Sequence, residues 1–152
     1  MRSDIEIREP KTKLEFEKYY DLRWWILRKP WNQPKGSEQD EMDEDSIHVM
    51  AINGEKVIGC GRGHLNSKVQ SQIRYMAVEK EYRGHGVGSR LLQALEKKIF
   101  EAGAKKIILK AREKAVPLYE RHGYQVYEKG EILFGEIKHY WMRKNDNRSF
   151  NK

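Results

Sequence analysis

The sequence predicts a mixed α/β fold, a single domain in which a central mixed, twisted sheet of about six to seven strands is flanked by helices. The length of 152 residues suits one domain. Short apolar runs alternate with amphipathic helical patterns along most of the chain. A strand, a helix and another strand follow one another after the middle, as in a crossover between parallel strands. We expect the domain to span 1–144 and a polar tail to follow at 145–152.

The first half of the chain predicts one long helix among several strands. Residues 5–9 alternate apolar and charged side chains, which is typical of a half-buried strand. Residues 11–28 carry two neighbouring apolar stripes at helical spacing, so this helix is buried on two sides or lines a cleft. Pro30 ends it. Further strands are expected at 47–52, 57–65 and 73–78.

An acidic segment lies between this helix and the second strand. Residues 38–45 read EQDEMDED, and Ser37 followed by Asp40 resembles a helix capping box. The pattern predicts a short helix near 38–44. The charges either attract a cationic amine or form a solvated face, and we interpret them as a solvated face.

The second half opens on a glycine-rich turn, YRGHGVGS at 82–89, which leads into an amphipathic helix closed by Gly103. The remaining elements expected are a strand at 106–110, a helix at 114–122, and closing strands at 124–128 and 137–142.

Composition narrows the class of protein. The net charge of +7 is spread along the chain, without the basic stripe and interleaved aromatics of a nucleic-acid binder. No apolar run is long enough for a membrane span, and the first residues lack the apolar core of a secretory signal. The single cysteine, Cys60, fits a reducing compartment. We therefore expect a cytoplasmic protein that binds neither nucleic acid nor membrane.

The glycine-rich turn offers bare backbone at the start of a helix. The first N–H groups of a helix lack intrahelical partners, and the helix dipole adds partial positive charge there. This favours a phosphate or diphosphate, although a tight strand-to-helix turn would explain the glycines equally well. The Gly84-x-Gly86-x-Gly88 spacing lacks the lysine of a Walker loop and differs from the G-x-G-x-x-G of dinucleotide-binding folds.

Three stretches resemble one known family. Residues 83–88, RGHGVG, fit the [QR]-x-x-G-x-[GA] pattern of the Gcn5-related N-acetyltransferase (GNAT) superfamily. Residues 111–124, AREKAVPLYERHGY, look like its second signature, except that Arg112 stands where many members carry asparagine. The ending GEILFGEIKHYWMRK is similar to that of a subgroup with a histidine in its final strand.

The resemblance implies an N-acetyltransferase with acetyl-CoA as donor and a primary amine of a small molecule or protein as acceptor, reacting directly in a ternary complex. The donor diphosphate would lie on the backbone of the glycine turn, and the pantetheine arm would run along the strand at 73–78. The residues implied for donor binding are Met76, Ala77, Val78, Arg83, Gly84, His85, Gly86, Val87, Gly88 and Ser89.

Two residues are candidates for catalysis. By resemblance, Tyr119 would donate a proton to the leaving thiolate, unless it is only a core aromatic. His139 is the candidate base because imidazole titrates near neutrality, with Glu131 and Glu136 as alternatives. An oxyanion would be stabilised by a backbone N–H near Ala77. The other histidines lack metal-ligand spacing, so no metal is expected.

The acceptor pocket is expected at the first helix and the loop after it. Its candidate residues are Trp24, Arg28 and Trp31, with Arg28 suited to a carboxylate or phosphate, although core packing would also explain the tryptophans. The main alternative function is a non-catalytic sensor of CoA or acyl-CoA on the same fold. The sequence leaves open the identity of the acceptor and whether the protein is a monomer or a homodimer.

Overall fold

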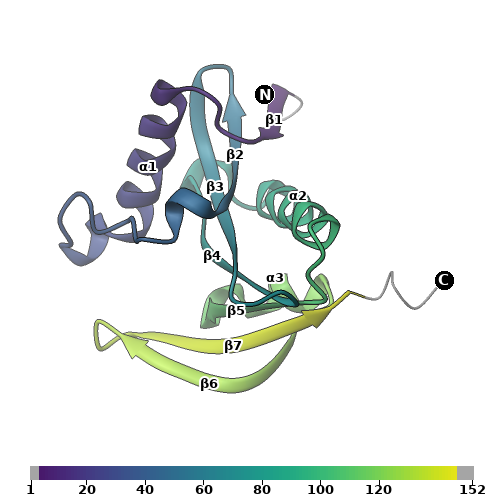
Figure 1. Ribbon diagram of the computed structural model, residues 1–152. Coiled ribbons are helices and arrows are strands. Elements are labelled where there is room, and N and C mark those ends of the chain that lie inside the picture. Colours follow the sequence, from purple (N-terminus) through teal and green to yellow (C-terminus); the bar gives the residue numbers. More distant parts are fainter. Residues whose placement is uncertain (1–3, 147–152) are drawn as a thin grey trace.

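The computed structural model describes residues 4–146, which form a seven-stranded sheet in the order β1-β2-β3-β4-β5-β7-β6 with helices on both faces (Figure 1). The strands are β1 (Ile5–Arg8), β2 (Ile47–Asn53), β3 (Lys56–Leu65), β4 (Gln70–Val78), β5 (Lys106–Arg112), β6 (Gln125–Leu133) and β7 (Ile137–Asn145). The α-helices are α1 (Lys13–Leu27), α2 (Val87–Glu101) and α3 (Val116–Arg121). The mixed α/β fold class is confirmed.

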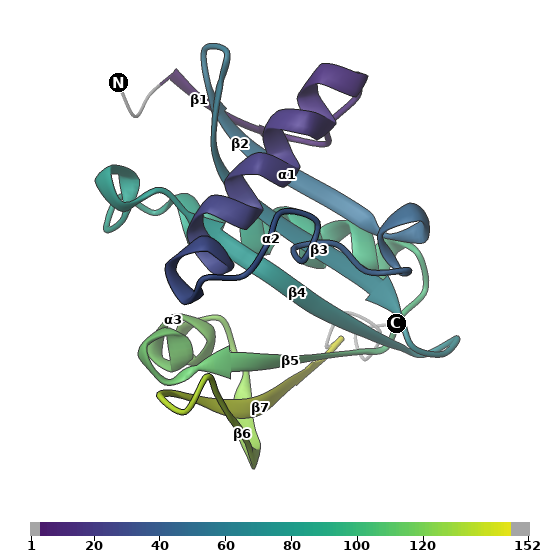
Figure 2. The same cartoon turned by 90° about the vertical axis from the view of Figure 1, so that its left-hand side faces the viewer.

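The sheet has one parallel pair, β4 with β5, and all other neighbouring strands are antiparallel. The parallel pairing joins only Gln70–Ile73 to Lys106–Leu109. Beyond this point the two strands separate, as Figure 2 shows, so that the stretch 74–78 of β4 has no partner on its β5 side. The predicted crossover through α2 therefore produces a gap in the sheet.

Helix α2 packs closely on one face of the sheet because β3 carries glycines there. A Cβ atom built on Gly61 would lie 2.5 Å from the sulfur of Met76 and 2.9 Å from Leu95. One built on Gly63 would lie 2.7 Å from Ile99. The glycines thus allow the leucine and isoleucine face of α2 to bury itself against the strand.

Helix α1 covers the opposite face. Thr12 and Glu15 form a reciprocal capping box at its start, which satisfies two backbone donors. Its buried face carries Tyr19, Leu22 and also Arg23, a charged residue that the apolar stripes did not predict.

The short helix predicted at 38–44 is wrong. This stretch forms turns, followed by a single 3₁₀ turn at Asp43–Asp45. The hydroxyl of Ser37 donates to the carbonyl of Pro34, and the backbone N–H of Asp43 bonds to the carbonyl of Asp40. The carboxylates that would have favoured a helix start are engaged with arginines of the sheet, as described below.

The closing strands are longer than predicted, and β7 includes Asn145, the first residue of the predicted tail. The rest of that tail beyond Asp146 lies outside the described residues. Within 4–146, no helix has the length and apolar character needed to cross a membrane.

Candidate active site

The glycine turn lies directly beside the gap between β4 and β5. Gly84 and Gly86 have φ angles of +80° and +83°, which an L-residue adopts only with strain, and no atom lies within 4 Å of a Cβ built on either. Gly86 is the N-cap of α2 and supplies no side-chain cap. The first N–H groups of α2 therefore border open space that suits an anion.

Gly88 sets the spacing between the elements around this turn. A Cβ atom at Gly88 would lie 3.6 Å from Leu118 of α3 and 4.0 Å from Val78 at the end of β4. The start of α2 thus sits against both. On the same turn, the Ser89 hydroxyl is 2.9 Å from Nε2 of His122.

A bulge interrupts β4 within the stretch that has no partner on its β5 side. Cys60 pairs with Ala77 and Arg62 pairs with Arg74, so two residues of β4, Tyr75 and Met76, oppose one of β3. Tyr75 has a φ of +60°, which is unusual for a residue with a side chain. Bulges leave backbone groups free of the ladder and redirect side chains, often beside active sites.

The ring of Tyr75 lies among three guanidinium groups. Those of Arg23, Arg62 and Arg74 are 4.3, 4.9 and 4.6 Å from its centroid. Asp40 joins the cluster, with its carboxylate 2.6 Å from Arg62, 3.1 Å from Arg74 and 3.4 Å from the Tyr75 hydroxyl. These contacts hold the bulge in place from the α1 side.

Asp43 supplies the second carboxylate of this cluster, which lies 2.9 Å from Arg23 and 3.1 Å from Arg62. Both arginine side chains are fully buried. Burial alone would raise the pKa of Asp43, but Arg23, the backbone N–H of Asp40 and Arg62 together outweigh it, and the pKa falls below its ordinary value. Because Asp43 and Glu38 are buried, the interpretation of the acidic segment as a solvated face is wrong for these two residues.

Cys60 is buried beneath the bulge, where its thiol donates to the carbonyl of Tyr75 at 3.2 Å. Burial raises the pKa of this thiol to about 11, so it stays protonated at neutral pH. A protonated thiol is a poor nucleophile.

Tyr119 is buried in α3, packed edge to face on Tyr124 with ring centroids 5.7 Å apart. Among residues 4–146, no group accepts a hydrogen bond from its hydroxyl. Burial raises its pKa, so the phenol keeps its proton throughout the neutral range. Tyr119 is therefore a core aromatic that retains a free donor.

His139 is buried on β7, with Nδ1 3.3 Å from the carbonyl of Glu131. Since a carbonyl only accepts, Nδ1 carries the proton and Nε2 keeps a lone pair. Burial lowers the pKa of His139, which leaves the ring neutral at pH 7. The carboxylate of Glu131 is paired with Lys110, whereas Glu136 is exposed in the turn before β7.

The structure separates the predicted acceptor residues into two places. Trp31 stacks on Phe134 with centroids 5.3 Å apart, and Arg28 lies 5.7 Å over the same ring. Phe134 belongs to the β6–β7 turn, so this hairpin reaches the loop after α1. Trp24 instead lines a cavity of about 550 Å³, together with Trp25 and residues at the ends of β3 and β4.

Comparisons with known proteins agree with this geometry. The acetyltransferase (GNAT) family model matches residues 16–124, and the chain belongs to this family. The uncharacterized N-acetyltransferase YjcF of Bacillus subtilis (strain 168) is 33% identical over 135 residues, which cover 89% of this chain and 96% of the relative.

Solved structures of low sequence identity share the fold. An aminoglycoside 6'-N-acetyltransferase complexed with coenzyme A matches with a TM-score of 0.78 at 19% identity, covering 92% of this chain and 96% of the other. A GNAT family acetyltransferase from Elizabethkingia anophelis with acetyl-CoA bound matches with a TM-score of 0.76 at 17% identity, covering 94% and 99%.

Sequence reasoning missed Tyr75, Asp40 and Phe134. One signal was present for the first two: Arg62 falls in the middle of a largely apolar, glycine-rich strand, and a charge buried there needs a carboxylate. Phe134 gave no signal, because the turn's approach to α1 is a tertiary feature. Among the described residues, no group of three or more histidine, cysteine or acidic side chains is arranged to hold a metal ion.

Proposed function

We propose that the protein transfers an acetyl group from acetyl-CoA directly to a primary amine of a small molecule or protein. The observation that carries this proposal is the gap between β4 and β5, bordered by unpaired β4 backbone and the exposed glycine turn. The stretch of Met76, Ala77 and Val78, which has no strand partner on its β5 side, suits the amides of pantetheine, which need hydrogen-bond partners once removed from water. The turn from Arg83 to Ser89 suits the diphosphate.

The bulge in β4 suits the reacting end of the donor. Backbone donors near Ala77 would stabilise negative charge on the thioester oxygen as the amine nitrogen attacks the carbonyl carbon. The C–N bond forms and the C–S bond breaks. Tyr119, protonated and with a free hydroxyl, would donate to the leaving thiolate.

The attacking amine must first lose a proton. An ordinary alkylamine has a pKa of about 10.4, so about one molecule in 2,500 is neutral at pH 7. His139 suits the role of base because its ring is neutral and its Nε2 has a lone pair. Arg28 and Trp31 would line the acceptor side, where Arg28 has no carboxylate partner among residues 4–146. Trp24 would belong to that side only if the acceptor also reached the cavity beyond α1.

Calorimetric titration with acetyl-CoA, followed by thiol release across amine classes, tests this proposal. The panel consists of polyamines, aminoglycosides, amino acids, amino sugars and peptides. Binding with release for one class would support the transferase and identify the acceptor class. Binding without release for any amine would favour the CoA sensor, and the absence of binding would refute both.

A further inference from the structure

Arg112 lies at the end of β5, where that strand has already separated from β4. It pairs across the sheet with His139 of β7, and its side chain is half-buried. Its position therefore places it on the β5 side of the gap, next to the candidate base on β7.

Arg112 has no counter-charge. Among residues 4–146 it forms no hydrogen bond and no ion pair, whereas the buried Arg23 and Arg62 each have a carboxylate within 3.1 Å. The neighbouring Glu113 is engaged elsewhere, since it accepts from the hydroxyl of Tyr140 at 3.3 Å. The half-buried guanidinium of Arg112 is therefore free to pair with an anionic ligand.

Arg83 stands on the other side of the gap. Its Nε donates to the carbonyl of Val78 at the end of β4, at 2.8 Å, and no carboxylate of the described residues pairs with it. Burial and the charge of Arg83 both lower the pKa of Arg112, so the two guanidinium groups are close enough to repel each other. An anion between them would relieve this repulsion.

We propose that Arg112 binds the diphosphate of the donor from the β5 side of the gap, opposite the backbone N–H groups of residues 83–88. This inference rests on the proposed function and adds a side-chain contact to a site otherwise built from backbone. The planar guanidinium fork suits two phosphate oxygens at once, which a lysine cannot match.

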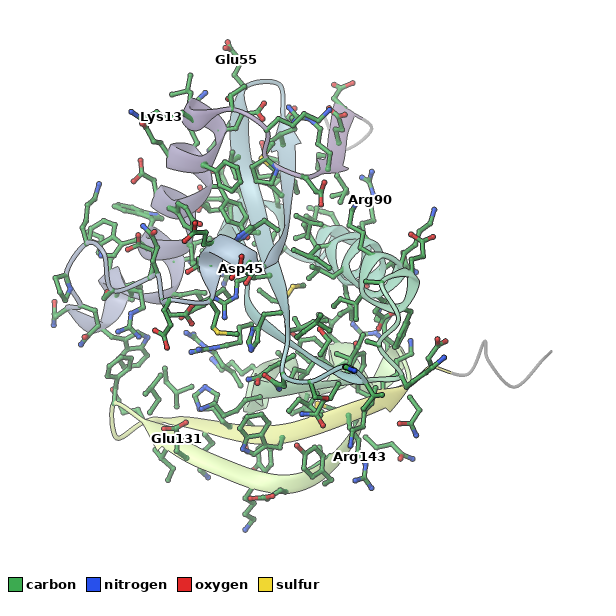
Figure 3. The ribbon with its side chains drawn as sticks, in the orientation of Figure 1. Lys13, Asp45, Glu55, Arg90, Glu131 and Arg143 are labelled. Carbon is green, nitrogen blue, oxygen red and sulfur yellow. The ribbon has the colours of Figure 1, made fainter. Side chains whose placement is uncertain are left out.

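Arg112→Gln and the matched control Arg143→Gln in the full chain test the proposal. Arg143 is exposed on the same strand as His139, stacks on Tyr127 at 5.1 Å, and lies at the opposite end of the β6–β7 hairpin from Glu131 (Figure 3). Each substitution removes one positive charge. Calorimetry with CoA should give about tenfold weaker binding for Arg112→Gln, because charge-assisted hydrogen bonds are the stronger ones. The control should stay within about twofold.

A donor without phosphates separates the diphosphate from the rest of the ligand. With S-acetylpantetheine, Arg112→Gln and the wild type should have equal kcat/KM. With acetyl-CoA, the variant should fall about tenfold, and Arg112→Lys, which keeps the charge but not the fork, should lie between. Thermal denaturation checks that each variant is folded, and if the glutamine variant is not, the lysine variant is compared on both donors instead.

Three results would overturn the proposal: unchanged CoA affinity in a folded variant, an equal loss with both donors, or a loss confined to the KM of the amine. The last would place Arg112 at the acceptor. A wild-type protein that does not bind CoA would refute the proposed function itself, so the two failures are distinguishable.

Discussion

Replacing Asp43 with asparagine removes the carboxylate that two buried arginines share. Asp43 lies 2.9 Å from Arg23 and 3.1 Å from Arg62, whose side chains have no solvent exposure, and only Arg62 keeps a second carboxylate, from Asp40. Removing one partner of a buried ion pair costs about 3–5 kcal/mol. At a urea slope of about 2 kcal/mol per molar, a loss of about 4 kcal/mol lowers the unfolding midpoint by about 2 M.

Urea unfolding of Asp43→Asn beside Asp45→Asn measures this loss. Asp45 is exposed in the same loop, so the control makes the same chemical change and should stay within about 0.5 kcal/mol of the wild type. The pKa of Asp43 is lower in the folded state than in the unfolded state. Its contribution to folding stability is therefore full above the unfolded-state pKa and disappears as pH falls through the folded-state pKa. The difference between wild type and Asp43→Asn should therefore shrink below about pH 4. If the two asparagine variants unfold at the same urea concentration, the ion cluster is not what stabilises this face.

Three further predictions concern the proposed chemistry and the core. Burial lowers the pKa of His139 below the ordinary histidine value of 6.5, so kcat should fall with decreasing pH only below that value. A pH–rate profile of His139→Gln should lack this acidic fall in kcat. Tyr119→Phe should lower kcat about 10²-fold or more while CoA affinity in calorimetry stays unchanged, and unchanged turnover would remove its role as acid. Gly61→Ala should lose about 1–3 kcal/mol in urea unfolding, since its Cβ would lie 2.5 Å from the sulfur of Met76 on β4 and 2.9 Å from Leu95 on α2, and wild-type stability would show that these two side chains can move aside.

Most of the fold could be predicted because its elements carry local signals. The amphipathic stripe of α2, the glycines at its two ends and the alternating pattern of β1 depend on neighbouring residues alone. The crossover length predicted that β4 and β5 are parallel. That they separate after Ile73 could not be predicted, because it depends on how α2, α3 and the β6–β7 hairpin pack together.

The acidic segment shows why local rules failed elsewhere. Ser37 and Asp40 have the spacing of a capping box, yet the side chain of Asp40 bonds to Arg62 and Arg74 on the sheet. Those arginines lie 22 and 34 positions later in the chain. A buried guanidinium needs its carboxylate more than a short exposed helix needs a cap, so tertiary contacts override the local preference.

The same contacts connect this segment to the gap between β4 and β5. A residue such as Tyr75, held at positive φ, stores about 1–3 kcal/mol of strain and persists only where its surroundings hold it. Asp40, Arg62 and the thiol of Cys60 all contact Tyr75 or its partners. The bulge therefore depends on residues outside both recognisable motifs. Those motifs locate the proposed diphosphate site in the sequence, whereas the shape of β4 at the proposed reacting end follows from the arginine cluster.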